Sequence, residues 1–161
     1  MKCLCFSDSH GSPELISRAL LLHRDATAVF FLGDGLSDVE AYLAADIRPW
    51  YAVRGNCDTS AYADGRFVPK TLTVTLHDRR IVLTHGDLYG VKGGLAGLRA
   101  LAADSSAALV LYGHTHTPHE EYSDGIYYFN PGSIAASYRS TPTYGIITVT
   151  DGGILLSHGS L

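Results

Sequence analysis

Long hydrophobic runs are absent from this sequence of 161 residues. No apolar stretch reaches the roughly 18 residues that a membrane-spanning helix needs, so we do not expect one. The sequence opens directly into an apolar segment at residues 3–7, without the hydrophobic region and cleavage site of a secretory signal. A cytoplasmic location is therefore expected.

Cysteine is scarce: there are 3 residues, an odd number that argues against a disulfide framework. Lys and Arg number 12 against 16 Asp and Glu, so the formal net charge of −4 offers no basic footprint for nucleic acid. Two bound divalent cations would roughly cancel that negative charge, so the charge does not exclude a small anionic substrate. The length suits one hydrophobic core, so a single domain over residues 1–161 is predicted.

The first half of the sequence alternates strand-like and helical patterns, and the second half is rich in hairpin signals. Ser12 as N-cap and Pro13 at the first helical position predict a first helix. The capping-box pattern at residues 37–40 predicts the start of a second helix, and a third is expected over residues 95–103. Two Asp-Gly pairs predict tight hairpin turns. The predicted fold class is α/β, with two mixed β-sheets packed face to face as a sandwich flanked by helices.

Apolar segments that read as strands are followed by residues that bind metals well. The segments are residues 3–7, 29–33, 51–55, 81–84 and 109–113, and the donors that follow them are Asp8, His10, Asp34, Asn56, His85, His114 and His116. Open α/β sheets bind ligands outside the carboxyl ends of their strands, so these donors are expected to converge. A single Gly-Asp pair after a strand usually indicates only a turn. Metal-binding residues after every one of these segments instead favour a site for two metal ions.

The donor types indicate which ions would bind. Carboxylate, carboxamide and imidazole suit borderline divalent ions, with manganese foremost and zinc, iron, nickel or cobalt as alternatives. The lack of clustered thiolates argues against a structural zinc site, and we expect Cys3 and Cys5 to lie in the core. Asp34 is the natural bridge between two ions, because the preceding Gly33 lets the backbone turn sharply.

The donor motifs resemble, in order, those of the calcineurin-like metallophosphoesterases. They are Asp8-Ser9-His10, Gly33-Asp34, Gly55-Asn56-Cys57-Asp58, His85-Gly86 and Gly113-His114-Thr115-His116. Together with Asn130-Pro131-Gly132-Ser133, they resemble the small cap-less bacterial and archaeal phosphodiesterase branch of that family. Each motif alone is weak, but the ordered set is specific.

The resemblance implies a ligand assignment and a mechanism. One metal would be held by Asp8, His10 and His116, the other by Asn56, His85 and His114, with Asp34 shared. A hydroxide bridging the two ions would attack the phosphorus of a phosphodiester in line with the leaving alkoxide. The Asn56 amide would also donate a hydrogen bond to a phosphoryl oxygen.

Cys57 stands where larger phosphatases of the family carry a histidine that helps protonate the leaving group. A thiol is a poor proton donor to an alkoxide, so we expect catalysis to depend on the metals. His10 or a metal-bound water is then the alternative general acid. Cys57 recurs in the small branch, so it does not indicate a dead site.

Three further residues are candidates for supporting roles. Asp38 and Asp58 would orient an imidazole from behind the ligands, although Asp38 is equally well explained as an acid in the first turn of a helix. Arg139 would bind a substrate phosphate, although Ser137 and Tyr138 stand where a proline more commonly precedes that arginine.

Two classes of function follow from the resemblance. The first is a phosphodiesterase acting on a small phosphodiester, nucleotide-derived substrates included, with a phosphomonoesterase as the alternative. The second is a protein-interaction scaffold, because a eukaryotic retromer subunit has the same fold with a degraded metal site. The complete donor set favours the enzyme. Family members are often dimers or tetramers, so a homo-oligomer stays open.

Overall fold

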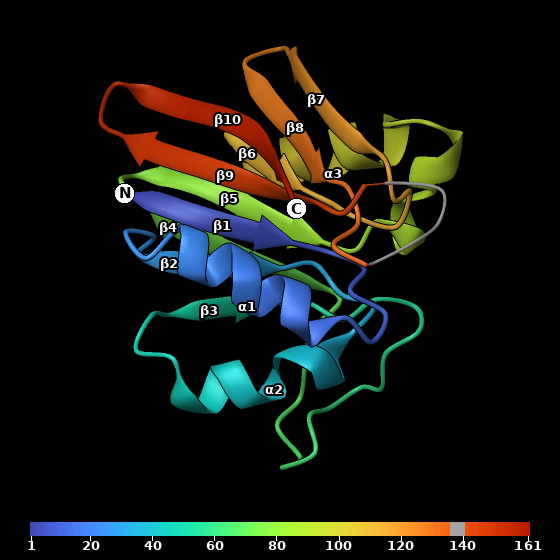
Figure 1. Cartoon of the computed structure of the whole chain (residues 1–161). Coiled ribbons are helices and arrows are strands. Elements are labelled where there is room, and N and C mark those ends of the chain that lie inside the picture. The colour runs from blue at the N-terminus through green and yellow to red at the C-terminus, as the bar shows by residue number, and fades with distance from the viewer. Residues whose placement is uncertain (136–140) are drawn as a thin grey trace.

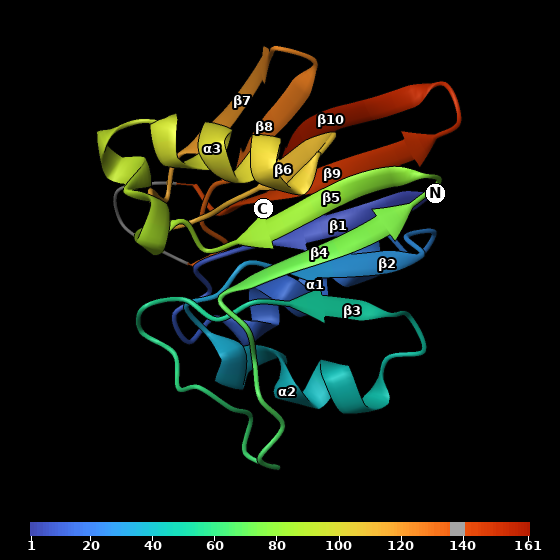
Figure 2. The same cartoon turned by 180° about the vertical axis from the view of Figure 1, so that it is seen from behind.

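The computed structural model describes residues 1–135 and 141–161. Two mixed sheets of five strands each pack face to face, and helices cover their outer faces (Figures 1 and 2). This is the predicted fold class. No helix in the described ranges is long and apolar enough to cross a membrane.

The first sheet has the strand order β10-β9-β1-β2-β3. Its strands are β1 (Lys2–Phe6), β2 (Ala28–Phe31), β3 (Trp50–Ala52), β9 (Thr143–Thr150) and β10 (Gly153–Ser160). Strands β1, β2 and β3 are parallel, and β9 pairs with β1 in the antiparallel sense. The crossover connections between the parallel strands contain helices α1 (Pro13–Leu22) and α2 (Leu36–Ala45).

The second sheet has the order β4-β5-β6-β8-β7. Its strands are β4 (Thr71–Leu76), β5 (Arg79–Thr84), β6 (Leu109–Leu111), β7 (Pro118–Ser123) and β8 (Ile126–Pro131). Strands β5, β6 and β8 are parallel. Between β5 and β6 the chain forms two short 3-10 turns, η1 (Asp87–Tyr89) and η2 (Val91–Gly93), and then helix α3 (Ala96–Ser105).

Successive side chains of a strand point to opposite faces of its sheet, and this alternation divides the core into layers. On β1, Cys3 and Cys5 are fully buried between the two sheets, while Leu4 and Phe6 pack beneath α1 and α2. Burial raises the pKa of the Cys3 thiol to about 11, as expected of an inert core cysteine. The prediction that both cysteines belong to the core is confirmed.

The predicted start of the second helix is wrong. Helix α2 begins at Leu36 with Gly35 as its N-cap, so the capping-box pattern at residues 37–40 lies inside the helix. The physical reason is a long-range cap: the Asp58 carboxylate accepts hydrogen bonds from the backbone N–H groups of Gly35 and Leu36 at 2.8 and 2.9 Å. A carboxylate from another loop thus satisfies the exposed amides of the helix end.

Candidate metal centre

The candidate donors meet at one end of the sandwich, where β1 and β2 of the first sheet and β5 and β6 of the second all end. They form two groups, each with its ligand atoms within 4.8 Å of one another. The groups are Asp8, His10 and His116, and Asp34, His85 and His114. Because both sheets contribute to each group, the cluster lies across the seam between them.

The first group surrounds one carboxylate oxygen. Asp8 Oδ1 lies 3.1 Å from His116 Nε2 and 3.7 Å from His10 Nε2. The two imidazole nitrogens are 3.3 Å apart. Asp8 is itself held by its other oxygen, Oδ2, which accepts hydrogen bonds from the Ser7 hydroxyl and the His114 amide. Oδ1 is therefore aimed at the imidazoles.

The second group is built around His85, which is fully buried. Its Nδ1 donates a hydrogen bond to the Leu32 carbonyl oxygen at 2.9 Å, which leaves Nε2 facing the other donors. Nε2 lies 3.3 Å from Asp34 Oδ2 and 3.2 Å from His114 Nδ1. It also lies 4.0 Å from Asp8 Oδ1, so the two groups adjoin.

These residues fit bound divalent cations. Asp8 Oδ1 is buried and has no hydrogen-bond partner among the residues that the structure describes. An uncompensated buried carboxylate oxygen is costly, and a cation would compensate it. Donor atoms held by one ion at about 2.1 Å lie about 3 Å apart, which is close to the spacing within each group.

Strained backbone conformations are concentrated at these donors. Outside glycine, positive φ is uncommon and costs about 1–3 kcal/mol where the surroundings enforce it. The described donors with positive φ are Asp8 (54°), His10 (41°), Asp34 (58°), His114 (68°) and His116 (59°). Gly33 also has positive φ, 97°, and a Cβ there would lie 2.3 Å from the Gly55 nitrogen. The turns therefore keep a strained backbone conformation that positions the donor side chains.

The charges of the cluster shift one another's pKa values. Burial acts to raise the pKa of Asp34, but hydrogen bonds from His85 and the Cys57 amide outweigh it and hold the pKa well below the ordinary value. Burial acts to lower the pKa of His85, but the hydrogen bond with Asp34 and the nearby carboxylates raise it. The Asp8 carboxylate beside it raises the pKa of His116. The site therefore favours positive charge beside its carboxylates.

Asp58 and Asp38 hold the donor-bearing turns. Asp58 accepts hydrogen bonds from backbone N–H groups of Asp34, Gly35, Leu36 and Gly55 at 2.7–2.9 Å. Asp38 accepts from the Ser9 hydroxyl and the Gly11 amide at 2.6 and 2.8 Å, on either side of His10. Among the described hydrogen bonds, Asp58 thus binds backbone amides, and Asp38 binds one hydroxyl and one backbone amide rather than an imidazole. Asp38 also lies in the first turn of α2, as its alternative explanation predicts.

The Asn-Pro-Gly-Ser motif holds the turns of the first group. The Asn130 side chain donates to the Gly113 carbonyl and the Thr115 hydroxyl at 2.9 and 3.1 Å. The Ser133 hydroxyl donates to the Asp8 carbonyl at 2.8 Å. From the sequence, this motif was recognised only by its resemblance to the family, because the residues to which it is hydrogen-bonded lie in distant loops.

The remaining candidates lie around the cluster. Asn56 is exposed, and its amide donates to Cys57 Sγ at 3.3 Å. The Cys57 amide donates to Asp34 Oδ1 at 2.8 Å, and the hydrogen bond of its thiol with Asp34 raises the pKa of that thiol. The hydrogen bond between the Cys57 amide and Asp34 places this turn, and with it Asn56, beside the second group. Arg139 lies outside the described residues, as do Ser137 and Tyr138.

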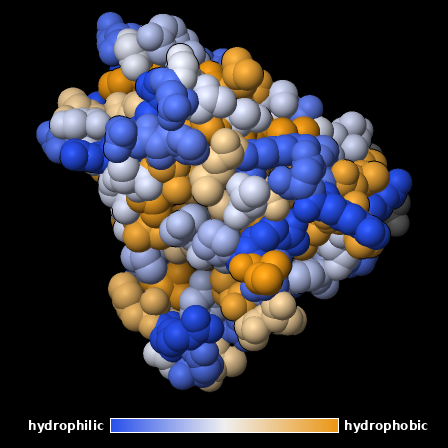
Figure 3. All heavy atoms as spheres, turned by 90° about the vertical axis from the view of Figure 1, so that its left-hand side faces the viewer, coloured by the Kyte–Doolittle hydropathy of each residue, from blue (hydrophilic) through white to orange (hydrophobic). Residues whose placement is uncertain are grey.

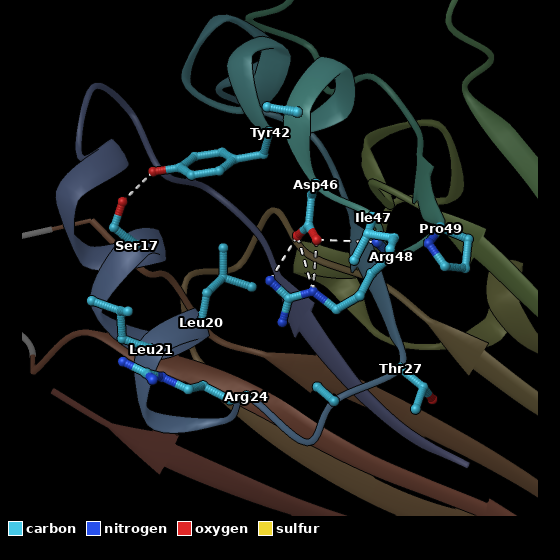
Figure 4. Close-up of a pocket in the computed structure, with 12 residues that line it drawn as sticks. Ser17, Leu20, Leu21, Arg24, Thr27, Tyr42, Asp46, Ile47, Arg48 and Pro49 are labelled. Carbon is cyan, nitrogen blue, oxygen red and sulfur yellow. Dashed lines mark hydrogen bonds and ion pairs between the residues drawn. The ribbon is translucent and has the colours of Figure 1, made fainter.

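A groove of about 800 Å³ lies away from the donors, between α1 and α2 (Figure 4). It is lined by Leu20, Leu21, Ile47 and the exposed Arg24, and the ion pair between Asp46 and Arg48 forms one side of it. In Figure 3, which views the end of the molecule opposite the donors, hydrophobic and hydrophilic side chains are interspersed. This groove contains none of the candidate site residues.

Comparison with known proteins agrees with the site. The model of the calcineurin-like phosphoesterase superfamily domain matches residues 1–152. The probable metallophosphoesterase YsnB of Bacillus subtilis is 33% identical over 150 residues, which cover 92% of this chain and 85% of YsnB. Phosphodiesterase YfcE of Escherichia coli is 32% identical over 167 residues, with 91% and 87% covered.

A solved structure agrees as well. The crystal structure of a predicted phosphoesterase from Streptococcus pneumoniae has a TM-score of 0.81 at 26% identity and covers 99% of this chain and 88% of its own. Fold, donor groups and relatives together define a metal-dependent phosphoesterase. Within that class, the chain belongs to the calcineurin-like phosphoesterase superfamily, as the motifs predicted.

Proposed function

We propose that this protein is a phosphodiesterase that binds two divalent ions, with manganese as the working ion. Two observations support it. The donors form two adjoining groups rather than one, and the E. coli relative is named a phosphodiesterase. We infer a small phosphodiester as substrate and a cytoplasmic location.

Two grooves beside the donor cluster favour a diester over a monoester. The Thr115-side groove, of about 360 Å³, is lined by residues that include Lys92, Thr115 and Glu121. The Cys57-side groove, of about 560 Å³, is lined by residues that include Glu40, Cys57 and Asp58. A phosphodiester carries two substituents and a monoester only one. Two separate grooves, one lined by Cys57 next to Asn56 and one by Thr115 between His114 and His116, therefore suit the diester.

The chain's residues would act as follows. Asp8, His10 and His116 would hold one ion, Asn56, His85 and His114 the other, and Asp34 both. Bound ions would supply a water of lowered pKa as nucleophile and stabilise negative charge on the phosphoryl oxygens. Asn56, exposed beside the cluster, would donate a hydrogen bond to a phosphoryl oxygen. His10, whose side chain is 35% exposed, or a water beside the ions would donate the proton that the leaving alkoxide takes up.

The test uses metal-stripped protein and a matched pair of p-nitrophenyl esters, one a phosphodiester and one a phosphomonoester, with and without added manganese. Manganese-dependent cleavage that prefers the diester is the expected result. Preference for the monoester would replace the proposal with a phosphomonoesterase. Failure to cleave either ester while two ions are bound would favour the scaffold.

A further inference from the structure

The two grooves beside the donor cluster differ in their charge. In the Thr115-side groove the Glu121 carboxylate is engaged by an ion pair with Arg99. The His119 ring is hydrogen-bonded to the Tyr112 hydroxyl at 2.8 Å. Lys92 is exposed and has no hydrogen bond or ion pair with any residue that the structure describes. This groove therefore carries one uncompensated positive charge.

Among the described residues, the charged side chains that line the Cys57-side groove are acidic. Asp58 directs both carboxylate oxygens at backbone amides, and Glu40 Oε1 accepts a hydrogen bond from the Ala63 amide at 2.8 Å. No Lys or Arg lines this groove among the described residues. An anionic group would be attracted to the Thr115 side and repelled from the Cys57 side.

Lys92 is held close to the donors by its own turn. It lies in η2 beside Val91, which is 5% exposed and packs over Gly86, the residue that follows His85. A Cβ at Gly86 would lie 2.9 Å from a Val91 methyl group, so this approach requires glycine. Lys92 and Thr115 line the same groove, and Thr115 lies between the donors His114 and His116, so the ammonium charge lies next to the donor cluster.

We propose that the Thr115-side groove is a subsite for an anionic substituent of the substrate, a carboxylate or a further phosphate, and that Lys92 determines this specificity. The inference rests on the proposed function, because it concerns the substituent attached to the phosphorus that the donors bind. The uncharged substituent then lies on the Cys57 side. A phosphodiester with one charged arm thus binds in a single orientation.

The test compares two ligands of equal length that are not hydrolysed, propylphosphonate and 3-phosphonopropionate, by calorimetry with the manganese-loaded protein. The wild-type protein is expected to bind 3-phosphonopropionate about tenfold more tightly, since a hydrogen bond to a charged group is worth that much. Lys92→Met should remove the preference, and Lys92→Arg should keep it. Arg24→Met is the matched control, because it removes one exposed positive charge from the groove between α1 and α2 (Figure 4).

Three results would overturn the subsite: wild-type protein that binds both ligands equally or neither, Lys92→Met protein that weakens both equally, or Arg24→Met protein that also loses the preference. Because the measurement involves no turnover, it is independent of the hydrolysis test. Retained preference for the carboxylate arm without any phosphodiester cleavage would contradict the proposed function and leave the subsite standing.

Discussion

His85 Nε2 lies 3.3 Å from Asp34 Oδ2, although the two residues follow strands of different sheets. Asp34 follows β2 in the first sheet and His85 follows β5 in the second. The buried His85 ring also reaches back to the Leu32 carbonyl, so one side chain joins the two sheets at the seam. Ions bound there would connect the sheets further, and ion binding should therefore be coupled to the stability of the sandwich.

Asp34→Asn is expected to bind fewer than two manganese ions. The substitution keeps the size of the side chain but removes the charge that two ions would share, so we expect affinity for the second ion to fall at least about 100-fold. Titration of metal-stripped protein with manganese, followed by electron paramagnetic resonance, measures both ions. Asp64→Asn, in an exposed loop, is the control and should bind as wild type. Two ions bound with unchanged affinity in Asp34→Asn would show that Asp34 is not the bridge.

Asp58→Asn should weaken both folding and metal binding. Asp58 accepts hydrogen bonds from four backbone amides, and an asparagine would turn an N–H group toward some of them. We expect a loss of about 1–3 kcal/mol in the free energy of unfolding without metal, from urea denaturation. We also expect roughly 10–100-fold weaker manganese binding, because the Asp34 turn is no longer fixed.

The same aspartate-to-asparagine change at Asp64 separates this effect from a loss of surface charge. The Asp64 side chain is 53% exposed and pairs only with Arg66 in the described contacts. Asp64→Asn should leave both the unfolding curve and the manganese titration unchanged. If Asp58→Asn behaved in the same way, the Asp58 hydrogen bonds would not support the site.

Much of the site follows from where the strands end, and that was visible in the sequence. Apolar segments ending in Asp34 or His85 predict donors at one edge, whichever sheet holds the strand. The α2 cap was not predictable, because the pattern at residues 37–40 is local while Asp58 caps the helix from 22 residues beyond Leu36. Lys92 was also missed, since an exposed lysine in a glycine-rich segment has no distinguishing local pattern.

Cys57→Ala should keep most of the activity toward an aryl phosphodiester. The thiol is exposed, and its hydrogen bond with Asp34 raises its pKa, which makes it a weaker proton donor. A p-nitrophenolate leaving group needs little protonation, so we expect kcat/KM within about threefold of wild type. His10→Ala provides the contrast, because it removes a candidate ligand and proton donor. A loss above about 100-fold in Cys57→Ala would assign the thiol a direct catalytic role.

The ion pair that closes α2 should make stability depend on pH. Asp46 accepts hydrogen bonds from Arg48 and from the Trp50 indole, and its side chain is 10% exposed. Burial acts to raise the pKa of Asp46, but these hydrogen bonds outweigh it and lower the pKa below the ordinary value. The stabilisation is therefore fully present above the unfolded-state pKa of about 3.9 and is lost as the pH falls through the folded-state pKa.

Asp46→Asn should accordingly lower the free energy of unfolding by about 1–2 kcal/mol near pH 7, with the difference from wild type shrinking as the pH falls through the lowered folded-state pKa of Asp46. Trp50, the single tryptophan of the chain, reports the transition by fluorescence. Chelator keeps both proteins free of metal, so that protonation of the donor cluster contributes equally to both. Asp25→Asn, which removes an exposed pair with Lys2, should follow the wild-type curve. A deficit in Asp46→Asn that stayed constant down to the lowest pH would show that lost packing, rather than the ionised carboxylate, accounts for it.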